Sequence, residues 1–562
     1  MSEHYRQLVA DVALEHAHSV HRGWEQEFLQ ALERVPMAMP PKAAADLRDL
    51  LMRMLEWHGD GVGRLQILHQ VQRMAQPLLD GLYRQIMAES HPLPAAKAEL
   101  AARVLVLRSL QARNTCMAVW ELANTDGSLP LLGRRRIMQT VNQGMLLTRD
   151  VLELSFLQYQ EPPRGTWHRL HALFGFARDS GLSERKCALA GEEGKSTARQ
   201  RYAQSLLLAM ANPWGLQRSE LVQAQSISRA LADGVRFDPQ GDWLAAGLTG
   251  GDSGPGFAGE VADVPAAALR FDPVPALEML EQQLSWSDKD AAMVTLGDGH
   301  GRQIEVRRSM LERVLRAWKG QAQREFDRVG ARHVMSVLVG MSAVHQAMAG
   351  GEDFETFRER LAGGDTEASV TGNAAAWLSG HSAAGPVHLE ARVLDQSLGG
   401  YRLQWPSGHG HRVRIGELVG LMPGSLQAAQ AEQHEAVMML GVLRWLRTIG
   451  QAELAVGVEL LSRQPRPAVV RGIDRQGKRG PLRRGLLLDQ DGATVELLMA
   501  NIREQPLSAV EVSCAEDEMS GQSVAMHRRR FTIGDARELS PSYYRVSLSD
   551  SGQNETQAQQ HD

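Results

Sequence analysis

The first 240 residues repeat apolar positions at helical spacing. Leu100, Val104 and Leu107, for example, follow one another at intervals of four and three residues, which places them on one face of a helix. Strand-like alternation of apolar and polar residues is nearly absent. Breaks such as His91–Pro94 divide the stretch into helices of ordinary length. The pattern predicts an all-helical domain over residues 1–240.

A glycine-rich stretch follows the predicted helices. Six glycines lie between Gly247 and Gly259, a composition typical of a flexible linker. We therefore expect a linker and a domain boundary at residues 241–262. Residues 263–320 then show the pattern of a mixed connector, with a helix, a hairpin and a second helix that ends near Trp318.

After Gly320 the chain changes to short β-type runs such as VHLEARVLD and GYRLQW, each bounded by turn-forming residues. These runs predict a small barrel over residues 321–464, interrupted by an insertion at 349–385. Further runs predict a second β domain at 465–549, and the tail at 550–562 lacks an apolar anchor, so we expect it to be disordered. The predicted fold class is α+β multi-domain: a helical N-terminal domain, a β-barrel and a second small β domain.

The composition limits the classes of protein to consider. The chain has 562 residues, of which 43% are apolar and 23% charged, so it can fill several ordinary globular cores. Its formal net charge of -5 gives no overall attraction to nucleic acid or to an anionic membrane. Cys116, Cys187 and Cys514 are too few and too far apart for a disulfide framework or a four-cysteine zinc site. No signal-peptide pattern and no apolar stretch long enough for a transmembrane segment is present, and we expect a cytoplasmic protein.

Two short motifs carry candidate binding chemistry. Arg324 and Arg328 lie four residues apart just before a predicted strand, and paired guanidinium groups match phosphate oxygens and the O6/N7 edge of guanine. Asp395, Ser397 and Gly400 lie between two predicted strands, where a carboxylate can accept hydrogen bonds from guanine N1–H and N2–H. Taken alone, each motif is more often a solvated arginine pair or an ordinary turn.

Together with the strands that follow, these motifs resemble a known family. The stretch from Gly441 to Leu461, with Gly-Val-Leu-Arg-Trp and Gly-Val-Glu, is similar to the two terminal strands of a PilZ domain, the bacterial receptor module for cyclic di-GMP. The helical first half is also similar to that of long proteobacterial proteins that end in such a module. The resemblance implies a ligand-binding site of five residues: Arg324, Arg328, Asp395, Ser397 and Gly400.

One feature departs from the family pattern. Asp395 follows Arg328 by 67 residues, a wider spacing than the family shows. An insertion at 349–385 between two barrel strands accounts for the difference, because closing a longer surface loop costs only about 0.6 kcal/mol for each doubling of its length.

These observations predict a non-enzymatic cyclic di-GMP receptor that couples nucleotide binding to a contact with an unidentified protein partner. Two alternatives stay open. One is a helical interaction scaffold with a vestigial barrel, and the other is a nucleic-acid-binding protein that uses the basic segment 471–484. We favour the receptor over both. We expect no catalytic residue and no metal site, because His300, His409 and His411 have no third ligand at a useful spacing.

Overall fold

The protein is described here from a computed structural model, which divides into two compact units, residues 1–323 and 324–562. Each unit is described by itself. The structure describes residues 3–12, 14, 17–89, 91–189, 194–246, 251–260, 264, 268–287, 291–297, 303–320, 327–362, 388–406, 413–424, 438–449, 453–488, 495–500, 507–514, 527–540 and 542–550.

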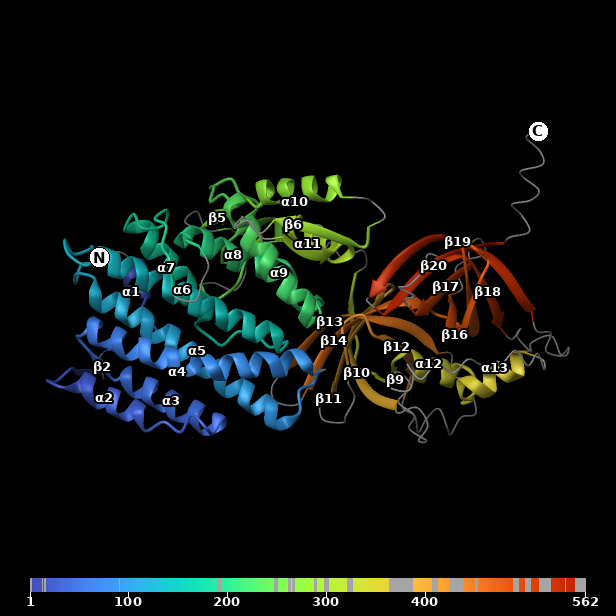
Figure 1. Cartoon of the computed structure of the whole chain (residues 1–562), viewed down its shortest axis with the longest axis horizontal. Coiled ribbons are helices and arrows are strands. Elements are labelled where there is room, and N and C mark those ends of the chain that lie inside the picture. Colours follow the sequence, from blue (N-terminus) through green and yellow to red (C-terminus); the bar gives the residue numbers. More distant parts are fainter. Residues whose placement is uncertain are drawn as a thin grey trace. The chain divides into compact units, whose positions relative to one another are not determined.

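The first unit is mainly helical, as its apolar periodicity predicts (Figure 1). Its first helices are α1 (Glu3–Gln7), α2 (Trp24–Glu33), α3 (Pro40–Met54), α4 (Gly61–Ala88), α5 (Ala95–Leu122), α6 (Arg134–Leu157), α7 (Thr166–Asp179), α8 (Ala198–Met210) and α9 (Arg218–Leu231). Short strands β1 (His18–Ser19) and β2 (Trp57–His58) pair in parallel near the start. Asp60 begins α4 by accepting hydrogen bonds from the backbone N–H groups of Val62 and Gly63.

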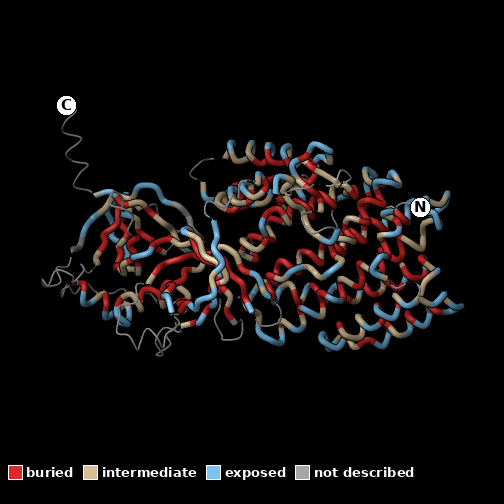
Figure 2. Tube along the Cα trace, turned by 180° about the vertical axis from the view of Figure 1, so that it is seen from behind, coloured by how far each residue is buried: buried red, intermediate tan, exposed pale blue. Residues whose placement is uncertain are grey.

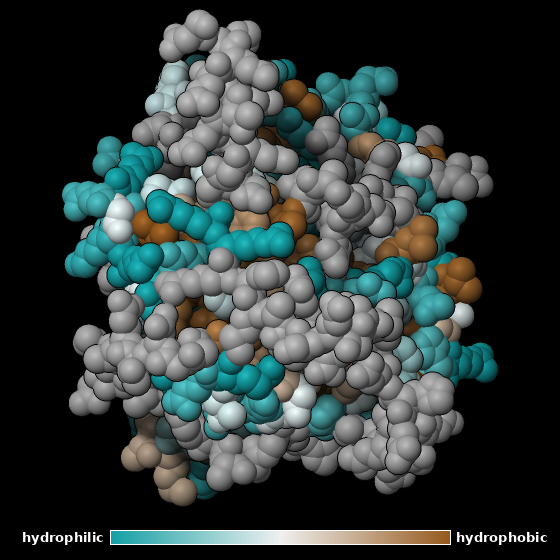
Figure 3. Space-filling view, turned by 90° about the vertical axis from the view of Figure 1, so that its right-hand side faces the viewer, coloured by the Kyte–Doolittle hydropathy of each residue, from teal (hydrophilic) through white to brown (hydrophobic). Residues whose placement is uncertain are grey.

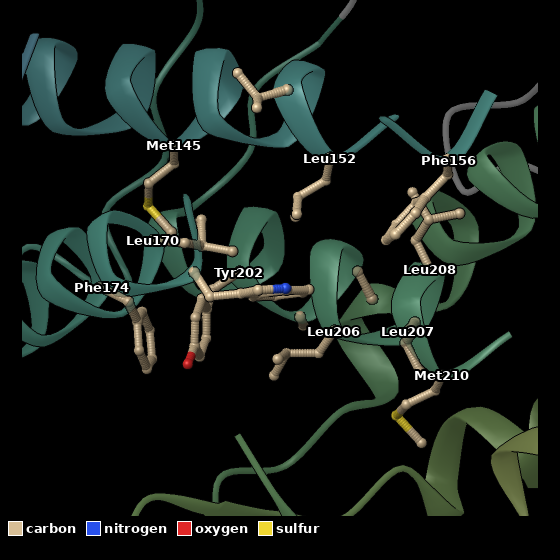
Figure 4. Close-up of a cluster of buried hydrophobic side chains, with 14 of the residues drawn as sticks. Met145, Leu152, Phe156, Leu170, Phe174, Tyr202, Leu206, Leu207, Leu208 and Met210 are labelled. Carbon is tan, nitrogen blue, oxygen red and sulfur yellow. The ribbon is translucent and has the colours of Figure 1, made fainter. Parts of the chain in front are cut away.

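The buried faces of these helices form two hydrophobic clusters (Figure 2), one of α2, α3 and parts of α4 and α5 and a larger one that continues through the other helices. Figure 4 shows part of it, where Phe174 and Tyr202 from α7 and α8 lie near Met145 and Leu152 of α6. The rings of Phe174 and Tyr202 are stacked with their centres 4.2 Å apart. Trp318 belongs to the same core and donates its indole N–H to the Leu207 carbonyl over 2.9 Å.

The region predicted as linker and connector is part of this unit. It contains β3 (Trp243–Leu244), β4 (Gly256–Phe257), β5 (Arg270–Phe271), α10 (Val274–Trp286), β6 (Met293–Gly297), β7 (Gln303–Arg307) and α11 (Arg308–Trp318). Asp252 accepts hydrogen bonds from the backbone N–H groups of Gly165 and His168 at the start of α7. Described residues of the expected linker at 241–262 thus contact the helices, and the division between the two compact units falls after Gln323.

The second unit begins with a closed antiparallel barrel. Its strands are β9 (Val334–Val339), β10 (His388–Ser397), β11 (Gly400–Pro406), β14 (Glu453–Ser462), β13 (Met439–Ile449) and β12 (Leu418–Pro423), and each pairs with the next. Pairing of β12 with β9 closes the ring. The alternating burial along β10 shows that one face of the strand points into the barrel.

The segment between β9 and β10 leaves and returns at neighbouring strands, since Leu338 lies opposite His388. It contains α12 (Met341–Met348) and α13 (Phe354–Ala362). The rest of the predicted insertion at 349–385 lies outside the described residues. A direct β9–β10 pairing means that the insertion does not separate the two halves of the barrel.

A second closed barrel follows, with the strands in the order β15 (Arg466–Asp474), β16 (Arg479–Leu488), β17 (Val495–Ala500), β20 (Tyr543–Asp550), β19 (His527–Ser540) and β18 (Leu507–Cys514). In the view of Figure 3, the described hydrophobic side chains form small separate patches among hydrophilic ones. Of the predicted tail at 550–562, Asp550 ends β20 and residues 551–562 lie outside the described residues. The arrangement confirms the predicted fold class of a helical N-terminal part followed by two β domains.

Candidate functional site

A short arm of the chain places Arg328 beside strand β10, which carries Asp395. The arm forms β8 (Val329–Gly330), which pairs with β10 so that Gly330 lies opposite Asp395. The backbone N–H of Ala331 extends this pairing by donating to the Leu394 carbonyl over 3.1 Å. Arg328 therefore reaches Asp395, and its Nη1 donates to Asp395 Oδ1 over 2.6 Å.

A second arginine completes the contact. Arg402 on β11 lies directly opposite Asp395 on β10, and its Nε is 2.9 Å from the other carboxylate oxygen, Oδ2. The side chain of Asp395 is only 15% exposed between these two cations. Sequence reasoning missed Arg402, although a hairpin closed at Gly400 would have placed it across from Asp395.

Ser397 and Gly400 form the tight end of the same hairpin. They pair across a two-residue connection, and Ser397 Oγ donates to the Gly400 carbonyl over 3.4 Å. Gly400 has φ 154°, and a Cβ there would lie 2.0 Å from the Val458 carbonyl oxygen. Only glycine fits, because the neighbouring β14 backbone occupies the space of a side chain.

More charges surround this hairpin. Glu459 lies opposite Gly400 and is paired with Arg444 of β13. Arg463 donates from Nη2 to the Leu398 carbonyl over 3.4 Å. Four arginines, those at 328, 402, 444 and 463, thus lie along the hairpin and its neighbours with two carboxylates, so positive charge is in excess among these residues.

The arrangement suits a flat, anionic ligand. Each guanidinium group has five N–H donors, and the contacts to Asp395 use one from Arg328 and one from Arg402. Leu398 and Val329 are unusually open for apolar residues, at 72% and 67% exposed. Free donors beside exposed apolar side chains can hold phosphate oxygens and cover the face of a base.

The structure brings together four of the five predicted residues. Arg328 and Asp395 are in contact, and Ser397 and Gly400 form the turn at the end of the same strand. Arg324 lies outside the described residues, as do His300, His409 and His411. Across the described ranges, no group of three metal-ligating side chains is found, and no helix there is long and apolar enough to cross a membrane.

The basic segment 471–484 is distributed over the hairpin of β15 and β16. Arg479 pairs with Glu511 of β18 over 3.0 Å. Arg484 lies 4.7 Å from the ring centre of Phe354, and burial lowers the pKa of its guanidinium group. Arg475 and Lys478 are exposed at the turn. At least two of the six cations are thus engaged within the second unit.

Comparisons with known proteins agree with this architecture. Residues 26–240 match the family model described as "Cyclic-di-GMP receptor FimW, N-terminal domain". Residues 251–389 and 373–467 match "Cyclic-di-GMP receptor FimW, middle PilZ domain". The cyclic-di-GMP receptor FimW of Pseudomonas aeruginosa is 22% identical over 430 residues, which cover 67% of each chain. The first match spans most of α2 and the helices α3 to α9, and the second spans the connector and the first barrel.

Proposed function

Since the chain belongs to the family of PilZ-domain cyclic di-GMP receptors with a helical N-terminal region, we propose that its first barrel binds cyclic di-GMP at the β10–β11 hairpin. The proposed ligand-binding residues are Arg324, Arg328, Asp395, Ser397 and Gly400. The observation that carries the proposal is the contact of Arg328 with Asp395, because it brings the two motifs together across the insertion. We add Arg402, which holds the other oxygen of the same carboxylate.

The roles follow from the donor and acceptor inventory. The arginines offer N–H groups to phosphate oxygens and to the O6/N7 edge of guanine. Asp395 has two oxygens with about four lone-pair positions, and its two arginine contacts leave acceptor capacity for guanine N1–H and N2–H. The arginines therefore hold the carboxylate in place while the ligand binds.

We further propose that the protein is a cytoplasmic, non-enzymatic receptor that transmits ligand binding to a protein partner. The side chains of Cys116 and Cys187 are buried and form no disulfide, which suits a reducing compartment. Arg328 lies at the start of an arm that pairs with β10, so a ligand that binds Arg328 can change the position of that start. Such coupling requires that the ligand binds more tightly to one position of the arm than to the other.

Titration calorimetry with cyclic di-GMP on the full chain tests the site. Arg328→Ala removes charge and geometry, whereas Arg324→Lys keeps the charge, so the alanine variant should lose more affinity. A charge-assisted hydrogen bond contributes about 1.5–3 kcal/mol, so Arg328→Ala should weaken binding at least about tenfold. The matched control is Arg479→Ala, which removes an arginine that is also paired with a carboxylate, in the second barrel.

Unchanged affinity in folded Arg328→Ala and Asp395→Ala proteins would overturn the site. A wild-type chain that shows no heat of binding would instead favour the interaction scaffold with a vestigial barrel.

A further inference from the structure

The loop between α5 and α6 exposes two adjacent leucines. Leu131 is 99% and Leu132 89% exposed, more than any other large apolar side chain in the described part of the protein. Such complete exposure means that no described neighbour covers either side chain. Burial of a leucine is favourable, so this loop keeps two apolar side chains in water without a structural benefit.

The base of the loop is held firmly. Gly127 is buried beneath the ring of Tyr5, and the Asn124 side chain donates to Ser128 Oγ over 2.9 Å. The Asp126 carboxylate accepts hydrogen bonds from the backbone N–H and hydroxyl of Ser128. Leu129 packs against the core of the unit. The two leucines are thus presented at the tip of an anchored loop.

Three arginines follow at once. Arg134, Arg135 and Arg136 form the first turn of α6 and are exposed, and among the described residues none of them makes a side-chain hydrogen bond or ion pair. Helical side chains lean toward the N-terminus, so these arginines reach back toward the leucine tip. The cluster is unfavourable for the helix itself, because cations oppose the positive end of the helix dipole and the first turn contains no carboxylate.

We propose that the 131–136 loop binds the surface of an anionic lipid bilayer. Leu131 and Leu132 enter the boundary of the acyl chains, and Arg134, Arg135 and Arg136 contact the lipid phosphates. Binding removes both unfavourable features of the free loop. The two leucines leave water, and the arginines and the helix N-terminus lie beside negative charge. Long arginine side chains suit this position, since their stems cover apolar surface while the charge stays at the headgroups.

A bilayer fits this tip better than a protein partner does. A stable protein interface buries about 800 Å² on each side, and its strongest contacts come mainly from Trp, Tyr and Arg rather than Leu. Two neighbouring leucines are too small for such an interface. Lipid chains, in contrast, surround a projecting tip on every side, and an anionic surface attracts the neighbouring cations.

Vesicle co-sedimentation of the full chain without cyclic di-GMP tests the proposal. We expect binding to vesicles of equal parts phosphatidylcholine and phosphatidylglycerol, little binding to phosphatidylcholine alone, and a decrease with added salt. The variant Leu131→Ser/Leu132→Ser and the variant Arg134→Glu/Arg135→Glu should each lower the partition coefficient by about tenfold or more. The side chains are exposed, and carboxylates suit a helix N-terminus, so neither variant should have a lower melting temperature than the wild type.

Two control variants distinguish binding through this loop from nonspecific binding through other exposed apolar or basic side chains. Trp286→Ser removes another exposed apolar side chain, and Arg185→Glu/Lys186→Glu reverses another exposed basic pair; both should bind vesicles as the wild type does. Equal binding to both vesicle types, an equal loss in the control variants, or no vesicle binding at all would overturn the proposal. The last outcome would leave a protein partner as the occupant of the tip.

Discussion

Gly400 shows how strictly one residue is determined by the backbone around it. Its position at the end of the β10–β11 hairpin brings the chain against β14, where the Val458 carbonyl fills the space of a side chain. The glycine therefore allows Ser397 and Asp395 to lie where the proposed site needs them. The same requirement makes Gly400 the best position for a test of the hairpin by substitution.

Gly400→Ala should lower the melting temperature of the second unit and weaken cyclic di-GMP binding together. A Cβ would lie 2.0 Å from the Val458 oxygen, so the hairpin must move, and such backbone conflicts cost about 1–3 kcal/mol. Thermal unfolding and calorimetry on the same sample measure both effects. Gly330→Ala is the control, because nothing lies within 4 Å of its added Cβ. An unchanged melting temperature in Gly400→Ala would mean that the turn is not constrained as described.

Among the elements, α12 connects the two barrels of the second unit. Met341 and Val344 pack in one cluster with Leu338 and Leu418 of the first barrel and Leu486 of the second. His345 on the same helix is fully buried, and its Nε2–H donates to the Ala468 carbonyl of β15 over 3.1 Å. A single helix inside the chain segment between β9 and β10 thus joins both hydrophobic cores.

Acid should weaken this connection through His345. The pKa of His345 is lowered to about 4, chiefly by burial and also by the charge of Arg484, while the hydrogen bond to Ala468 opposes the shift. The unfolded chain then binds a proton at a higher pH than the folded one, so the stability that depends on neutral His345 is present above about pH 6.5 and is lost as the pH falls toward 4. The contribution is up to about 3 kcal/mol.

The measurement is the melting temperature of the second unit across this range of pH. His345→Gln keeps a side-chain donor but does not titrate, so its melting temperature should fall less steeply than that of the wild type. Parallel curves for the two proteins would show that other groups cause the acid sensitivity.

The elements also show what the sequence could predict. The motif around Asp395 located the hairpin and its glycine, because turn chemistry is local. The pairing of Asp395 with Arg402 follows from strand register, which local patterns specify only after the hairpin is known. The role of α12 was not predictable, because its contacts with β15 and β16 join parts of the chain more than 100 residues apart.

At the scale of the whole molecule, the glycine-rich stretch at 241–262 shows that composition and packing report different properties of the chain. The composition of 241–262 correctly describes backbone freedom in an isolated peptide, but the carboxylate of Asp252 and the ring of Phe271 tie the described parts of the neighbouring region to the helices. The first family match ends at residue 240 and the second begins at residue 251. The compact units, in contrast, separate after Gln323. The family and the packing therefore give different boundaries.

A pair of fragments decides between these boundaries. A fragment of residues 1–323 should unfold cooperatively near the melting temperature of the first unit in the full chain, because it retains the complete helical core. A fragment of residues 1–240 loses Phe271, Met310 and Trp318, which are fully buried in that core. Each large apolar side chain contributes about 1.5–3 kcal/mol on burial, and a domain has a net stability of only about 5–15 kcal/mol. The shorter fragment should therefore aggregate or melt without cooperativity in calorimetry and circular dichroism. If it instead unfolds as cooperatively and at as high a temperature as residues 1–323, the helices form a domain by themselves and residues 251–320 are an accessory that belongs with the barrel.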